Sequence, residues 1–148
     1  MPRNSRFSVM FWRPQGSYPA AMLTPANRSS PGRALDDHRL RRVMQFIEAN
    51  LQNHIQLKDL AEIANLSPFH FLRAFRKATG EAPHRFIQGC RLAKARQLLE
   101  DESLTLAEIS LICNFSSQSS FTRAFTRAVG MAPGKYREIY GPGLRKRA

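Results

Sequence analysis

The sequence predicts an all-α protein in which a long linker helix joins two helix-turn-helix subdomains, with about seven helices in total. Three observations support this fold class. Apolar residues recur at three- and four-residue steps between Asp36 and Tyr140, as they do along amphipathic helices. Residues 57–83 and 106–133 carry nearly the same pattern. Glycine, asparagine and proline stand where helices would begin, reverse or end.

The first helix and the first subdomain follow from start and stop signals. Asp36 and Asp37 precede an apolar stripe, which indicates a helix start. The first subdomain takes residues 57–80, with a short helix, a turn and a second helix that Gly80 ends. The apolar residues expected to point inward come from the helix that starts at Asp36 and from the short helix that starts at Leu57. They are Leu40, Val43, Met44, Ile47, Leu51, Leu57, Leu60, Ala61 and Ala64.

The linker helix and the second subdomain follow in the same way. Pro83 suits the first turn of a helix, and this helix is expected to run over residues 83–100. The second subdomain takes residues 106–130, and a last helix is expected from Pro133 to Tyr140. Residues 141–148 form a basic tail.

Residues 1–35 are expected to be a flexible basic leader. They hold five of the nine prolines and five arginines but no acidic residue. Within them, the apolar run at residues 7–12 either docks on the body of the protein or is the remnant of an upstream domain. Arg13 and Pro14 end this run too early for a secretory signal.

The charge of the chain restricts the class of partner. Its 148 residues include 23 Lys or Arg and 11 Asp or Glu, which gives a formal net charge of +12. Such a surplus favours a polyanion, with nucleic acid the first expectation and an anionic membrane the second. A basic protein without any polyanionic partner is the alternative.

Patterns typical of enzymes, metal sites and membrane spans are missing from the sequence. Cys90 and Cys113 form no CxxC pair and fall in apolar helical positions, so we expect buried, reduced thiols. The four histidines are widely spaced, and Asp59 and Glu62 are better explained as solvated or capping charges than as catalytic ones. We therefore expect no enzyme activity, no cofactor and no metal, and a cytoplasmic, nucleoid-associated location.

The repeat contains one inserted residue. Leu57 and Leu106 lie 49 positions apart, whereas Phe71 and Phe121 lie 50 apart, so the second copy has one extra residue just after its turn. Asn65 and Asn114 stand at the reversal, where a left-handed conformation is expected and asparagine is tolerated next best to glycine. Ser67 can cap the helix that follows, and Ser116 or Ser117 can do so in the second copy.

Helical periodicity divides the second helix of each copy into a buried and an exposed face. The buried faces are expected to hold Phe71, Ala74, Phe75 and Ala78, and Phe121, Ala124, Phe125 and Ala128. The exposed faces are expected to hold Phe69, Leu72, Arg73 and Arg76, and Gln118, Ser119, Thr122, Arg123 and Thr126.

The exposed residue types suit the major groove of DNA. Arg bonds guanine O6 and N7, Gln bonds adenine N6 and N7, and Ser or Thr serves either base. Phe69 and Leu72 make sense on a solvent face if they contact thymine methyl groups; the alternative is that Phe69 packs back onto the core.

The linker helix would set the spacing of two reading helices. Residues 83–100 would span roughly 27 Å, which approaches the roughly 34 Å of one DNA turn. A single chain could then read an asymmetric site as a monomer. Arg85, Arg91, Lys94 and Arg96 along this helix either contact phosphates or remain solvated.

Residues 36–140 resemble the DNA-binding domain of the AraC/XylS family of bacterial transcription regulators. The resemblance is carried by LKDLAEIANLSPFHFLRAFRKATGEAP, RLAKARQLL and LAEISLICNFSSQSSFTRAFTRAVGMAPGKYR. It implies two helix-turn-helix units, promoter DNA as partner, and activation through contact with RNA polymerase. The base-contacting positions that it implies are Phe69, Leu72, Arg73, Gln118, Ser119, Thr122 and Arg123. The candidate phosphate contacts are Ser67, Arg76, Ser117, Arg91, Lys94 and Arg96.

The sequence departs from the family pattern in two respects. Asn65 and Asn114 stand at turn positions where the family usually has glycine. Only 35 residues precede the DNA-binding part in this sequence, so we expect either a stand-alone member similar to MarA and SoxS or a piece of a larger regulator. No small-molecule ligand is evident. A non-specific architectural DNA binder and a polymerase-recruiting module that binds DNA weakly are the other functions considered.

Overall fold

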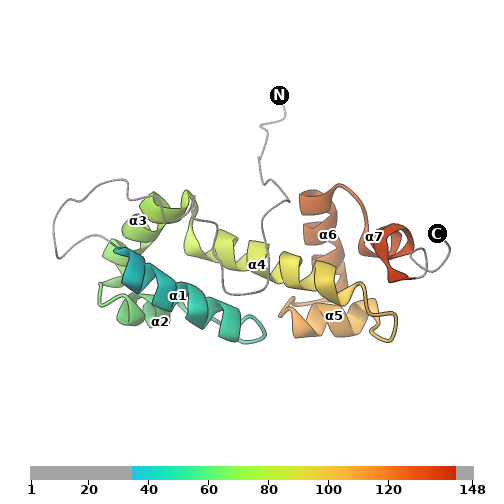
Figure 1. The fold of residues 1–148 in the computed structure, drawn as a ribbon, viewed down its shortest axis with the longest axis horizontal. Helices are drawn as coiled ribbons and strands as arrows, with labels where there is room; N and C mark the ends of the chain where they lie inside the picture. The colour runs from blue at the N-terminus through green and yellow to red at the C-terminus, as the bar shows by residue number, and fades with distance from the viewer. Residues whose placement is uncertain (1–34, 143–148) are drawn as a thin grey trace, which may run out of the picture. The chain divides into compact units, whose positions relative to one another are not determined.

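The computed structural model describes residues 35–142, which form seven helices and no strand (Figure 1). The helices are α1 (Asp37–Ala49), α2 (Leu57–Ile63), α3 (Pro68–Thr79), α4 (Pro83–Leu98), α5 (Leu106–Ile112), α6 (Gln118–Val129) and α7 (Pro133–Tyr140). The predicted all-α fold with two helix-turn-helix subdomains is therefore confirmed. The expected leader, its apolar run at residues 7–12 and most of the basic tail lie outside the described residues.

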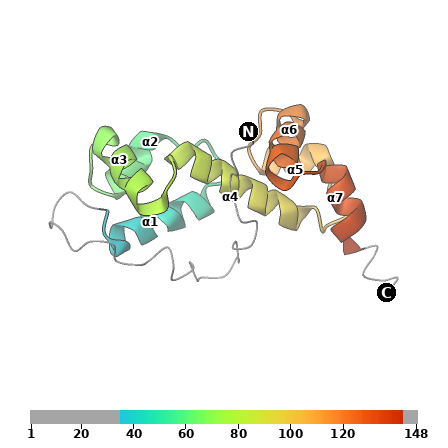
Figure 2. The same ribbon diagram turned by 90° about the horizontal axis from the view of Figure 1, so that it is seen from above.

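The helices form two compact units whose boundary falls inside α4. The first unit ends at Arg91 and the second begins at Leu92. In the first unit, α1, α2 and α3 pack with the beginning of α4; in the second, α5, α6 and α7 pack with its end (Figure 2).

Each unit has a hydrophobic core of its own, and α4 supplies side chains to both. The core of the first unit consists of Leu40, Val43, Met44, Ile47, Leu51, Leu60, Ala61, Ala64, Phe71, Phe75, Ile87 and Cys90. The core of the second consists of Leu92, Ala95, Leu99, Ile109, Cys113, Phe121 and Phe125. Both cysteines are buried, as predicted. Burial is the main reason why the pKa of Cys90 rises to about 12, so this thiol is protonated and unreactive at neutral pH.

The two units repeat the same aromatic packing. Phe75 of α3 meets Phe86 of α4 edge-on, with ring centroids 5.5 Å apart. Phe125 of α6 meets Tyr136 of α7 in the same way, also at 5.5 Å. The start of α4 therefore closes the first unit as α7 closes the second.

An arginine of each closing helix binds backbone carbonyls elsewhere in its own unit. Arg91 donates from Nε to the Leu51 carbonyl (3.0 Å) and from Nη2 to the Asn53 carbonyl (2.9 Å). Arg137 of α7 donates likewise to the carbonyls of Leu99 (3.3 Å) and Leu104 (2.7 Å). We call these two contacts the arginine clasps. Each one secures the loop that precedes a short helix.

Three predicted details are wrong. Leu57 is exposed because it opens α2. Ala78 and Ala128 are exposed because the buried side of each helix continues through Thr79 and Val129, one position further on. The linker helix ends at Leu98 rather than near Glu100, since Glu100 and Asp101 bond the carbonyls of Gln97 and Leu98 in a tighter final turn.

The first arginine clasp, formed by Arg91, should contribute measurably to the free energy of unfolding. Replacement of Arg91 by Ala leaves two carbonyl groups without their charged donor, and we expect it to lower the free energy of unfolding by about 1–3 kcal/mol. Urea denaturation of the whole chain measures this, with Lys94→Ala as the control on the same helix. An equal, small effect of both substitutions would show that the Arg91 clasp contributes nothing.

Glu81, between α3 and α4, should make the first unit sensitive to pH. Its Oε2 atom is buried and has no hydrogen-bond partner among the described residues. Burial raises the pKa of this carboxyl, and the nearby Arg85 lowers it less. The second unit carries Met131 at the equivalent position, 50 residues on.

Because the folded chain holds the Glu81 proton more tightly than the unfolded chain, Glu81 favours folding at acid pH. That contribution is lost as pH rises from the usual range of a glutamate pKa through the raised value. We therefore expect Glu81→Gln to gain stability relative to the wild type as pH rises from about 4 to 7. Urea midpoints at several pH values test this, and parallel pH curves for the two proteins would contradict it.

Candidate nucleic-acid interface

The turn between the helices of each subdomain has the same geometry in both copies. Asn65 has φ 53° and Asn114 has φ 54°, so the predicted left-handed conformation is confirmed. The N–H of the next residue closes the turn on a carbonyl five positions back: Leu66 on Ala61 and Phe115 on Ser110, both at 2.9 Å. This hydrogen bond closes the end of the first helix of each pair.

Serine side chains cap both second helices, α3 and α6. Ser67 Oγ accepts the N–H of His70 (3.2 Å), and Ser117 Oγ accepts the N–H of Ser120 (3.0 Å). Ser116 is thus the inserted residue, and its hydroxyl donates to Ser120 Oγ instead. Of the two serines considered for the second cap, Ser117 provides it.

The far ends of α3 and α6 also match. Gly80 (φ 82°) and Gly130 (φ 86°) each adopt the left-handed conformation that ends a helix. Both second helices are therefore 12 residues long and rigidly defined at each end. They differ only in the side chains that they expose.

The exposed face of α3 carries apolar side chains next to its positively charged ones. Phe69 is 64% exposed and Leu72 37%, so the alternative in which Phe69 packs onto the core is wrong. The Arg73 guanidinium lies over the Phe69 ring, with Cζ 5.8 Å from the centroid. The His70 ring meets Phe69 edge-on at 5.9 Å. Arg73, Phe69 and His70 thus hold one another in place on the surface.

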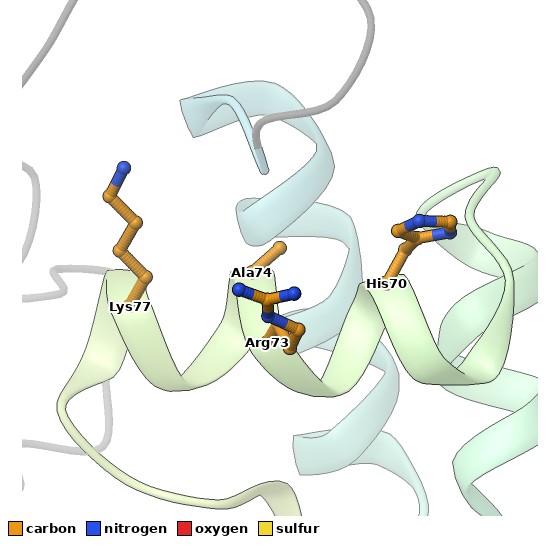
Figure 3. Close-up of a pocket in the computed structure, with 4 residues that line it drawn as sticks. All are labelled: His70, Arg73, Ala74 and Lys77. Atoms are coloured by element: carbon orange, nitrogen blue, oxygen red, sulfur yellow. The ribbon is translucent and has the colours of Figure 1, made fainter.

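A second row of α3 forms a shallow basic pocket that sequence reasoning missed. His70, Arg73, Ala74 and Lys77 line a cavity of about 410 Å³ (Figure 3). Their side chains project from successive turns of the helix. Periodicity predicts Arg73 on the exposed face and Ala74 on the buried face, and it assigns neither His70 nor Lys77 to a face. The cations of this row suit a phosphate group.

The exposed face of α6 is polar. Gln118, Ser119 and Arg123 are exposed, and Thr122 is partly buried. Thr126 is exposed, but its hydroxyl donates to the Thr122 carbonyl (2.7 Å), so that donor is already used. Four of the five predicted exposed residues therefore keep side chains available to a ligand without breaking a helix contact.

The electrostatics of both second helices favour an anion. Neither α3 nor α6 contains an acidic residue, whereas α3 carries Arg73, Arg76 and Lys77, and α6 carries Arg123 and Arg127. The ion pairs in residues 35–142 lie elsewhere, between Asp36 and Arg39 and between Lys135 and Glu138. The partial positive charge at each helix N-terminus adds to this field.

Two of the three α4 cations that were predicted to contact phosphates also bind groups within the protein. Arg91 forms a clasp, and Arg96 donates to the Tyr136 hydroxyl (3.3 Å) while its guanidinium lies over the Tyr136 ring. Lys94 is partly buried. Arg91 and Arg96 therefore have structural contacts, and the phosphate-binding role of all three stays a prediction.

Other kinds of site find no support in residues 35–142. No cluster of three or more His, Cys, Asp or Glu side chains in that range is placed to hold a metal ion. None of its helices combines the length and apolar character that crossing a bilayer requires. Asp59 accepts the Gln56 N–H (3.3 Å) as part of a capping box, in agreement with the capping role considered for it.

Comparison with known proteins decides the family. A family model described as a helix-turn-helix domain matches residues 60–139, more than half of the chain. AarP of Providencia stuartii, a transcriptional activator, is 33% identical over 64% of this chain and 70% of its own length. A regulator from Chromobacterium violaceum, described as an AraC-type DNA-binding domain-containing protein, superimposes with a TM-score of 0.65 at 28% identity, over 68% of this chain and 90% of its own. The chain belongs to the AraC-type family of helix-turn-helix transcriptional regulators.

Two further transcriptional regulators are similar to this chain. The DNA-binding domain of AdpA, solved in complex with a target DNA, superimposes with a TM-score of 0.64 at 30% identity, over 69% of this chain and 92% of that domain. LumQ of Photobacterium leiognathi is 37% identical over 62% of this chain, but the match spans only 37% of its length. The chain thus spans about a third of the length of LumQ and about two thirds of that of AarP.

The cap of α6 can be tested with adjacent serines. Ser117→Ala removes the acceptor of the Ser120 N–H, and we expect it to lower the free energy of unfolding by about 1 kcal/mol. Ser116→Ala removes a hydroxyl that caps nothing and should cost markedly less. Urea denaturation of both variants measures the difference, and a larger cost for Ser116→Ala would contradict the assignment of the cap.

Proposed function

We propose that this AraC-type chain regulates transcription by binding a specific promoter sequence, with α3 and α6 as recognition helices in the major groove. The observation that carries the proposal is the pair of identically capped helices whose exposed faces are basic and chemically different. The relative AdpA, whose DNA-binding domain was solved on a target DNA, supports double-stranded DNA as the partner.

The exposed side chains divide by the bases that they can read. Arg73 and Arg123 suit guanine, Gln118 suits adenine, and Ser119 and Thr122 can serve either. Phe69 and Leu72 offer apolar contact only. Because the two faces differ, the proposed site consists of two different sequence blocks rather than a palindrome.

A second set of groups is proposed to contact phosphates. Ser67 and Ser117 stand at the N-termini of the recognition helices, where backbone N–H groups and the helix dipole attract an anion. The remaining proposed contacts are Arg76, Arg91, Lys94 and Arg96, to which the α3 pocket adds His70 and Lys77. Such contacts set affinity and register but not sequence.

We propose further that one chain binds both blocks as a monomer and activates transcription through RNA polymerase in the cytoplasm, at the nucleoid. The continuous helix α4, shared by the two units, supports reading by a single chain. AarP, named as an activator, supports the direction of regulation.

A binding selection from random duplexes at physiological salt tests the proposal. Enrichment of two different short blocks, bound one chain per duplex, is the expected outcome. Binding to bulk DNA without enrichment would favour the non-specific architectural alternative. A promoter reporter then tests whether activity depends on sequence recognition by Arg123. Promoter output that survives Arg123→Ala would favour the alternative of a polymerase-recruiting module that binds DNA weakly.

Arg123 should read one base position. We expect Arg123→Ala to weaken binding to the selected site by about 1–3 kcal/mol and to relax the preference at that position only. Arg127→Ala, in the last turn of the same helix, serves as the matched control for loss of a positive charge. Quantitative binding to all four bases at each position measures this, and an equal loss on every sequence would leave Arg123 only a phosphate contact.

A further inference from the structure

The two recognition helices differ most at two positions that the repeat makes equivalent. Phe69 and Leu72 of α3 correspond to Ser119 and Thr122 of α6, 50 residues on in each case. The first pair offers no hydrogen-bonding side-chain atom, and the second pair offers hydroxyl groups. Every buried aromatic position of the two helices, by contrast, is the same in both copies, as Phe71 with Phe121 and Phe75 with Phe125 illustrate.

The exposed apolar pair is built into the surface of α3. Phe69 and Leu72 lie one turn apart, and both are large hydrophobic side chains in contact with solvent. The Phe69 ring is oriented by the edge of His70 and by the guanidinium of Arg73. A ring held in this way is presented to a ligand at little conformational cost.

Arg73 places hydrogen-bond donors beside this apolar pair. Because its guanidinium lies over the Phe69 ring, its N–H groups, which lie in the guanidinium plane, remain available at the edge of the pair. An arginine in the major groove bonds O6 and N7 of guanine. The only apolar group that a base exposes in the same groove is the methyl group on C5 of a pyrimidine.

We propose that α3 recognises a C5-methylated pyrimidine next to a guanine: Phe69 and Leu72 cover the methyl group while Arg73 bonds the guanine. This inference rests on the proposed function and specifies what one half of the site must contain. Thymine and 5-methylcytosine carry the same methyl group, so either base provides the chemistry. Unmethylated cytosine and uracil do not.

The surroundings of the pair favour DNA over an apolar protein partner. Arg73 and Arg76 flank it, Lys77 follows one turn later, and α3 contains no acidic residue. A polyanion satisfies these cations as it covers the apolar pair, whereas an apolar protein surface would leave them unpaired. A protein partner is therefore an outcome of the test rather than the proposal.

The decisive comparison uses the unaltered full chain and changes only the DNA, after one variant has located the α3 block. First, binding of Arg73→Ala to base-substituted duplexes identifies the α3 block as the positions where preference is lost. Each thymine in this block is then replaced by deoxyuridine, which removes the methyl group and leaves base pairing intact. We expect the thymine beside the Arg73-dependent guanine to lose about fourfold in affinity, the value of one buried methyl group. Thymines outside the bound site serve as the control and should show no change.

Two further experiments test which side chains recognise the methyl group and which base can carry it. The double variant Phe69→Ser, Leu72→Thr gives α3 the residues of α6, and it should bind thymine and uracil duplexes equally; its circular dichroism and urea midpoint establish that it folds. A duplex with cytosine in place of that thymine, paired with guanine, is compared with and without a 5-methyl group. Tighter binding to the methylated form extends the recognition to 5-methylcytosine, and equal binding restricts it to thymine.

The outcomes separate this inference from the proposed function. If a specific site is bound but thymine and uracil are equivalent throughout the α3 block, methyl recognition is overturned while sequence-specific binding stands. Phe69 and Leu72 would then serve a protein partner, and their substitution would leave DNA binding unchanged. If no sequence is enriched from random DNA, the proposed function and this inference fail together.

Discussion

The helix α4 has to satisfy two hydrophobic cores at once, and the rest of the described structure depends on how it does so. Ile87 and Cys90 belong to the first core, and Leu92, Ala95 and Leu99 follow in the second. Within each group the spacing is three or four residues, but the step from Cys90 to Leu92 is only two. At about 100° per residue, that step moves the buried stripe to another side of the helix. One element thereby closes the first unit and opens the second.

The helices α3 and α6 are supported by contacts that repeat between the units, and the residues that they expose do not repeat. The left-handed asparagine turn, the serine cap, the terminal glycine and the edge-on aromatic pair occur in both. The arginine clasps add a second, longer-range restraint to each. The side chains that differ, Phe69 against Ser119 and Leu72 against Thr122, lie outside both cores. The contacts that hold α3 and α6 in place are thus separate from the side chains that distinguish their exposed faces.

Most of the fold could be predicted because its signals are local. Asn65 and Asn114, Ser67 and Ser117, and Gly80 and Gly130 each act within one turn of chain, so residue type and spacing were enough. The arginine clasps could not be predicted from the sequence. The residues around an arginine do not show whether its side chain bonds a carbonyl 40 residues away or faces solvent. The contact of Arg73 with Phe69 and the pocket residues His70 and Lys77 were missed for another reason. A helix surface has more than one row, and periodicity alone ranks none of them above the others.

The division of α4 between two cores also limits where this helix can change in length. A residue inserted between Ile87 and Cys90 would turn Cys90 by about 100° relative to Ile87, and the first core would lose one of the two side chains. An insertion between Leu92 and Ala95 would disrupt the stripe of the second core in the same way. Substitutions at the exposed positions of α4 leave both stripes intact. Within each unit, α4 therefore accepts new side chains more readily than new lengths.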